Sequence, residues 1–164
     1  MRYAKITAPD INNGLGFRVS LFVQGCTIKC KGCFNPETHN FRGGKKFTSE
    51  EMRKLLDLCN HDYIQGLSIL GGEPLHPLNV AGVINICRIF KQFFPDKDIW
   101  LWSGYNFDWI NRRYALYKDI LDLCDVMVIG PFQIEKKDLS IAFRGSSNQE
   151  IWQKDSCGLW CQWK

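Results

Sequence analysis

The sequence has no apolar run that approaches the roughly 18 residues of a membrane-spanning helix. Its opening stretch, MRYAKITAPD, contains no apolar core of the kind that a secretion signal requires. Low-complexity segments, internal repeats and linker-like stretches are also absent from its 164 residues. Neither sign of charge dominates, because 21 Lys and Arg residues face 17 Asp and Glu residues. We therefore expect one cytoplasmic domain over residues 1–164, with no membrane or nucleic-acid partner.

Cysteine, in contrast, is plentiful, with eight residues. In the reducing cytoplasm, that number indicates metal binding or redox chemistry rather than structural disulfides. Three of them, Cys26, Cys30 and Cys33, lie within the stretch GCTIKCKGCFN at 25–35. Glycines and a proline in and after this stretch argue against a regular helix. They predict a loop over about 25–41 that wraps around a bound group.

The three loop cysteines allow more than one kind of site, because thiolates select zinc, copper(I) or iron–sulfur clusters. A zinc site could be completed by His39, although structural zinc ligands usually come in two separated pairs. A four-iron cluster held by three cysteines leaves one iron open to a substrate, and the ligand type and spacing favour this alternative. Simple burial in the core fits Cys59, Cys87 and Cys124, on apolar helix stripes, better than it fits the loop cysteines.

Apolar strands alternate with amphipathic helices along the chain, which predicts an α/β fold with a parallel sheet covered by helices. The expected strands are 17–25, 67–70, 98–103 and 126–129, and the expected helices are 48–59, 80–94 and 107–124, the last in two pieces. Loops that follow parallel strands meet at one edge of the sheet. The loops expected there are the cysteine loop, Gly71–Pro74, Ser103–Tyr105 and Gly130–Phe132.

The pattern Cys-x3-Cys-x2-Cys directly after the first expected strand resembles the signature of radical S-adenosylmethionine (SAM) enzymes. Four stretches together are similar to the activating proteins of anaerobic ribonucleoside-triphosphate reductases. They are NGLGFRVSLFVQGCTIKCKGCFNPET, GGEPLHPLNV, DIWLWSGY and FRGSSNQ. The resemblance implies an incomplete (β/α) barrel of the radical SAM type with a mostly parallel sheet.

The resemblance also implies a site. Cys26, Cys30 and Cys33 would hold one [4Fe–4S] cluster per chain, whose fourth iron would be chelated by the amino and carboxylate groups of SAM. No catalytic residue is expected beyond these ligands. The expected SAM-binding residues on the adenine side are Gly32, Cys33 and Phe34. At the methionine end they are Gly71, Gly72, Glu73 and Pro74, with Glu73 at the ammonium. Ser103 and Tyr105 are expected near the ribose or adenine.

The activity implied is reductive cleavage of SAM, whose 5′-deoxyadenosyl radical would create the glycyl radical of the large reductase subunit. An electron donor such as flavodoxin or ferredoxin would be needed. An activating enzyme of another glycyl-radical protein, such as a formate-lyase type, is an alternative. A non-catalytic zinc or iron–sulfur binding module is another. So small a barrel leaves its open side to the partner, and we expect contact through residues 131–149, including Arg144, and through Trp160 and Trp163.

Three features depart from the family pattern or stay open. The chain has Ile129 and Gly130 where an Asp-Gly pair is usual, and Glu150 where a basic or apolar residue is more familiar. Cys157 and Cys161 lie in an expected short tail over about 150–164. They could complete a metal site, form a regulatory disulfide or have no role, because spacing alone does not decide.

Overall fold

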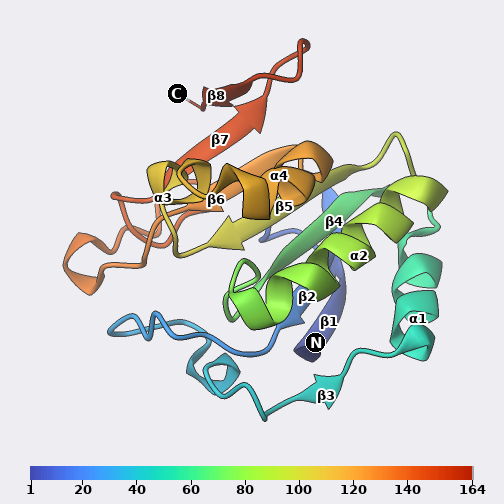
Figure 1. Ribbon diagram of the computed structural model, residues 1–164, viewed down its shortest axis with the longest axis horizontal. Helices are drawn as coiled ribbons and strands as arrows, with labels where there is room; N and C mark the ends of the chain where they lie inside the picture. The colour runs from blue at the N-terminus through green and yellow to red at the C-terminus, as the bar shows by residue number, and fades with distance from the viewer. Residues whose placement is uncertain (164) are drawn as a thin grey trace.

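Eight strands form a single sheet in a computed structural model that describes residues 1–163 (Figure 1). The strand order is β3-β1-β2-β4-β5-β6-β7-β8. The strands are β1 (Arg2–Asp10), β2 (Phe17–Val23), β3 (Lys45–Lys46), β4 (Ile64–Gly71), β5 (Asp98–Ser103), β6 (Val126–Ile129), β7 (Glu150–Lys154) and β8 (Trp160–Gln162). β2, β4, β5 and β6 pair in parallel, whereas the pairings outside this central group are antiparallel.

The predicted α/β fold with parallel central strands is therefore confirmed, but the sheet as a whole is mixed and open. Antiparallel strands flank the parallel centre on both sides, and the sheet ends at β3 and β8 without closing. The structure differs most from the prediction over 150–164, where a short tail was expected and the described part contains β7 and β8. These two strands pair in a hairpin that extends the sheet beyond β6 (Figure 1).

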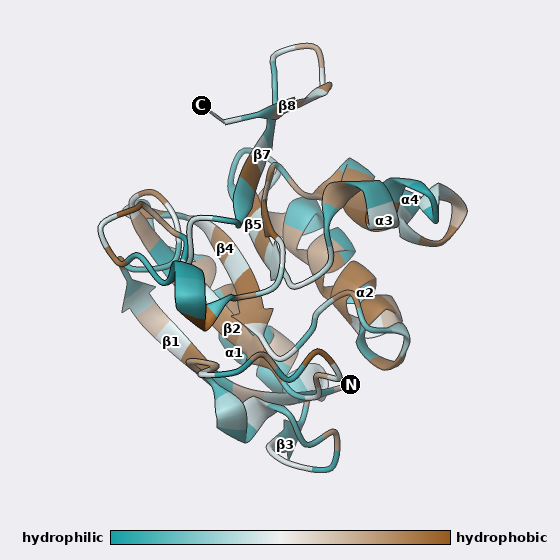
Figure 2. Ribbon diagram, turned by 90° about the vertical axis from the view of Figure 1, so that its left-hand side faces the viewer, coloured by the Kyte–Doolittle hydropathy of each residue, from teal (hydrophilic) through white to brown (hydrophobic). Residues whose placement is uncertain are grey.

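The helices are α1 (Ser49–Cys59), α2 (Pro77–Phe93), α3 (Phe107–Asn111) and α4 (Tyr114–Leu123). Thr48 and Glu51 form the capping box that begins α1. The buried faces of α1, α2 and α4 pack with one face of the strands in the main hydrophobic core. Figure 2 shows this as brown on the central strands and on α2. None of the helices in residues 1–163 is both long and apolar enough to cross a membrane.

The opposite face of the sheet carries a smaller apolar cluster. Trp100 and Val128 are buried there, and Trp102, Phe143 and Trp163 pack against this cluster. The Trp102 indole N–H donates to the Phe143 carbonyl at 2.9 Å. The segment 131–149 is thereby held against the face that the helices do not cover.

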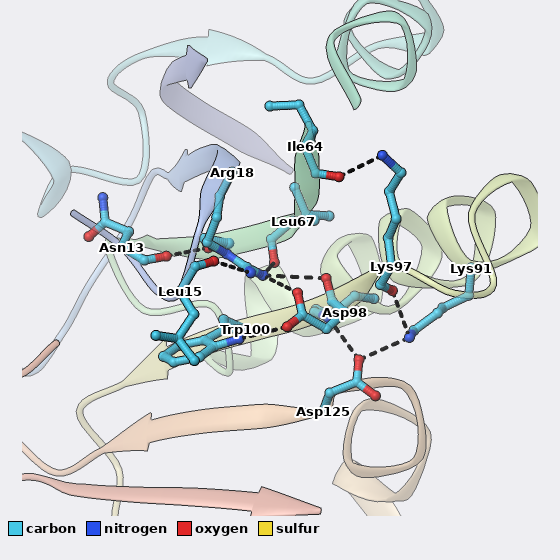
Figure 3. A network of polar contacts seen from close by, with 12 residues as sticks. Asn13, Leu15, Arg18, Ile64, Leu67, Lys91, Lys97, Asp98, Trp100 and Asp125 are labelled. Carbon is cyan, nitrogen blue, oxygen red and sulfur yellow. Dashed lines mark hydrogen bonds and ion pairs between the residues drawn. The ribbon is translucent and has the colours of Figure 1, made fainter. Parts of the chain in front are cut away.

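A buried arginine ties the amino ends of three parallel strands together (Figure 3). The Arg18 side chain is fully buried and forms an ion pair with Asp98 at 2.7 Å. It also donates to the Ser68 hydroxyl and the Leu67 carbonyl. Because these partners come from β4 and β5, the network lies at the sheet edge opposite the cysteine loop.

Candidate metal centre

The cysteine loop leaves β2 and closes on itself. The Gly25 N–H donates to the Thr38 carbonyl at 2.7 Å, and the Cys26 N–H donates to the His39 carbonyl at 3.2 Å. Between these points only one short 3-10 turn, Pro36–Thr38, is regular. The prediction of a closed loop rather than a helix is therefore confirmed.

The three loop cysteines have free thiols that are partly buried. Burial is the largest cause that raises the pKa of Cys26 and of Cys30, while backbone N–H groups, including that of Phe132 beside Cys30, act in the opposite direction. The Asn35 N–H donates to the Cys33 sulfur at 3.4 Å. Donors around the sulfurs stabilise thiolates, the form that binds metal.

A cavity of about 610 Å³ opens beside this loop. Its lining includes eight of the predicted residues, namely Cys26, Cys30, Cys33, Phe34, Gly71, Gly72, Glu73 and Ser103. The predicted Gly32, Pro74 and Tyr105 are not among its lining residues in the described chain. Such a volume suits a small-molecule ligand. Gly130 and Phe132 also line the cavity, so residues that follow all four parallel strands meet around one space, as the topology predicts.

Close backbone approach joins the loop after β4 to the cysteine loop. The Glu73 N–H donates to the Gly25 carbonyl at 2.8 Å. A Cβ at Gly72 would lie 2.6 Å from the same oxygen, so no larger residue fits without movement. Gly71 has a φ of +104°, in the region that favours glycine. These two glycines are required by geometry at this contact.

The Glu73 carboxylate is buried and links the loops after β4 and β5. It accepts hydrogen bonds from the Leu75 N–H at 2.9 Å, the Ser103 hydroxyl at 2.8 Å and the Gly104 N–H at 2.8 Å. Burial raises the pKa of Glu73 to about 7, although these donors lower it. The carboxylate thus faces the cavity while holding its wall together.

Two polar residues that the sequence analysis did not single out hold the same junction. The Asn79 amide, on the first turn of α2, donates to the carbonyls of Gln24, Gly25 and Glu73 at 3.0–3.3 Å. The Gln24 amide donates to two carbonyls in the second half of the cysteine loop, at 2.8 Å each. Each is a polar residue between apolar neighbours, and this was the signal available in the sequence.

The segment 131–149 packs against the cysteine loop. The rings of Phe34 and Phe132 lie 4.9 Å apart. A Cβ at Gly32 would lie 2.9 Å from the end of Ile134. The segment that we expect to contact a partner therefore touches the candidate site directly.

The remaining cysteines divide as the sequence suggests. Cys59, Cys87 and Cys124 are buried, whereas Cys157 and Cys161 are exposed in the β7–β8 hairpin. His39 lines the cavity with the loop cysteines. Among residues 1–163, no three His, Cys, Asp or Glu side chains are arranged to hold a single metal ion. A four-iron cluster has a different requirement, because each of its protein ligands binds a different iron.

An α/β sheet with three free thiols in one loop at the carboxyl edge of its strands defines a candidate single-cluster iron–sulfur protein. The family model described as "4Fe-4S single cluster domain" matches residues 12–152. The anaerobic ribonucleoside-triphosphate reductase-activating protein of Enterobacteria phage T4 is 39% identical over 160 residues, which cover 98% of each chain. The proteins of that name from Salmonella typhimurium and Escherichia coli K12 are 40% and 39% identical over 153 residues, 92% of this chain and 97% of theirs.

The chain belongs to the family of anaerobic ribonucleoside-triphosphate reductase-activating proteins. The resemblance found in the sequence is thereby confirmed.

Proposed function

We propose that the chain is a radical SAM activating enzyme that generates the glycyl radical of an anaerobic ribonucleoside-triphosphate reductase. The observation that carries the proposal is that three free thiols share one cavity with the glycines after β4 and with Ser103. The names of the relatives support the partner, because they describe activation of that reductase. The proposed domain comprises residues 1–164.

Cys26, Cys30 and Cys33 would hold one [4Fe–4S] cluster. The residues fit such a group, because all three thiols line the cavity and backbone donors stabilise negative charge on sulfur. When bound, the cluster would supply the electron for cleavage of SAM to methionine and a 5′-deoxyadenosyl radical, and that radical would take a hydrogen atom from a glycine of the reductase. The protein would supply orientation and a cavity in which SAM is held.

The other residues would bind SAM. Gly71 and Gly72 allow the methionine end to approach the backbone, and the Glu73 carboxylate would accept a hydrogen bond from the SAM ammonium. Among residues 1–163, its Oε2 atom accepts one hydrogen bond, from the Gly104 N–H, so it retains capacity for another. Phe34 is 53% exposed at the cavity and would lie on the adenine side. Gly32, Pro74 and Tyr105 would act through the backbone or from behind the cavity wall.

The expected electron donor is a flavodoxin or a ferredoxin. We place the activity in the cytoplasm, where eight free thiols persist.

The experiment is electron paramagnetic resonance on the reconstituted protein mixed anaerobically with the cognate reductase. A glycyl doublet should require SAM, a reductant and both proteins. A doublet on a formate-lyase-type enzyme instead would support the alternative activating enzyme. Metal analysis that found zinc, or iron without SAM turnover, would leave only a binding module.

A further inference from the structure

We propose that a small electron-carrier protein with an acidic surface docks where α3 meets α4. A stack of Tyr105, Trp109 and Arg113, here called the aromatic stack, would connect that docking surface to the cysteine loop. This inference rests on the proposed function, because it concerns how an electron reaches the cluster. One electron would leave a flavin hydroquinone, which becomes the semiquinone, and would reduce the oxidised cluster.

The aromatic stack runs from the cysteine loop to the protein surface. The rings of Tyr105 and Trp109 are stacked, with centroids 3.8 Å apart and planes 18° from parallel. The Arg113 guanidinium lies 4.1 Å from the centroid of the Trp109 ring. At the inner end, Gly104, which precedes Tyr105, lies against the cysteine loop, because a Cβ at Gly104 would overlap with Cδ1 of Ile28. The stack therefore starts beside the cysteine loop.

The outer end of the stack carries two arginines and one exposed aspartate, Asp108 of α3, so its net charge is positive. Arg112 and Arg113 are adjacent and exposed, and neither forms an ion pair with a carboxylate among residues 1–163. On the neighbouring α4, Asp119 and Asp122 are already paired with other basic side chains. A partner with an acidic surface would gain favourable long-range attraction at this surface.

This docking surface and the segment 131–149 lie on different faces of the sheet. Tyr105 and Trp109 pack against the main core on the helix-covered face of the sheet. Phe143, in the segment expected to contact the reductase, packs on the opposite face. Figure 1 shows α3 and α4 over the sheet, with α1 at the far side of the molecule. A carrier at this surface therefore leaves the segment 131–149 accessible, whereas Trp160, which is also expected to contact the reductase, lies close to α3, because the Trp160 and Phe107 ring centroids are 6.2 Å apart.

The test measures binding of an oxidised, acidic flavodoxin to the reconstituted protein by calorimetry at low and moderate salt. The variant is Arg112→Glu with Arg113→Glu. Its matched control is Arg53→Glu with Lys54→Glu, an adjacent exposed pair on α1 with the same change of charge. We expect the first variant to weaken binding on the order of tenfold and to reduce its salt dependence, and the control to bind like the original protein. Equal weakening in both variants, or none in either, would overturn the proposed surface.

A second variant, Trp109→Leu, keeps the charge and removes the central ring. We expect flavodoxin binding to be retained while reduction of the cluster by saturating reduced flavodoxin becomes slower. Reduction by dithionite, a small reductant that needs no docking surface, should stay unchanged. Equal rates with flavodoxin before and after the substitution would overturn the role of the stack. If the unsubstituted protein did not cleave SAM after reduction with dithionite, that result would instead contradict the proposed function.

Discussion

At the scale of single residues, the loop cysteines and the core cysteines should respond differently to the same substitution. Cys30→Ser removes one of only three proposed ligands, so we expect loss of bound iron and of SAM cleavage after anaerobic reconstitution. Cys87→Ser places a hydroxyl in a fully buried site and should lower the free energy of unfolding by roughly 1–3 kcal/mol. Iron analysis and the optical spectrum distinguish the two. A Cys30→Ser protein with normal iron and turnover would contradict the assignment.

Glu73 should make stability depend on pH. Because burial raises its pKa from 4.5 to about 7, the native protein binds more protons than the unfolded chain between those values. Deprotonation of Glu73 therefore makes the free energy of unfolding of the protein fall as the pH rises through that window. Above the window this effect is constant. Relative to Glu73→Gln, the original protein should lose roughly 2 kcal/mol between pH 5 and pH 8. Urea unfolding of both proteins measures this, and parallel pH profiles would show that Glu73 does not titrate there.

The residues of the candidate site were predictable to different degrees. The cysteines and the glycines after β4 follow from chemistry, because soft ligands and close backbone contacts require those residue types. Tyr105 was expected near SAM, yet its ring lies against Trp109 and outside the cavity lining. A strand end places a residue near the site but does not fix which way its side chain turns. The clamp by Asn79 depends on three carbonyls that meet only in the folded chain.

At the scale of elements, the central strands were predictable because they are buried on both faces. The expected bounds 98–103 and 126–129 agree with β5 and β6. β1 was not predicted, since only its second and last residues are buried and it carries three charged side chains and a proline. β7 has a single buried residue, Ile151, and is held in the sheet by its pairing with β6. Such strands are defined by their partners rather than by their own composition.

The Arg18 network at the amino ends of the strands should contribute to stability without affecting the metal centre. Arg18→Met leaves the Ser68 hydroxyl and a backbone carbonyl without their donor and should cost roughly 3 kcal/mol. Arg88→Met is the matched control, because Arg88 and Asp119 form an exposed pair that contributes less than about 1 kcal/mol. Chemical denaturation gives both values. Iron content after reconstitution should be the same in both variants, and a loss of iron in Arg18→Met alone would contradict this division of roles.

At the scale of the whole molecule, the two faces of the sheet serve different purposes. The helices and the main core cover one face and fix the positions of the strand ends. The other face carries a small cluster, the segment 131–149, which also borders the cavity, and the loop after β1, whose Asn13 carbonyl accepts from the Ser68 hydroxyl. A macromolecular substrate has access to the cavity from this side, so the segment should affect partner binding more than SAM chemistry.

A substitution at Leu139 tests whether the segment 131–149 affects partner binding more than SAM chemistry. Leu139 lines the cavity mouth and is 68% exposed, so a charge there should disturb a protein partner but no internal packing. We expect Leu139→Asp to weaken reductase binding on the order of tenfold, as for an apolar residue at the centre of an interface, and to lower the yield of glycyl radical. SAM cleavage with dithionite should be unchanged. Leu116→Asp, 52% exposed on α4, is the matched control and, with dithionite as the reductant, should activate the reductase normally. Normal radical yield with Leu139→Asp would place the reductase contact elsewhere on the molecule.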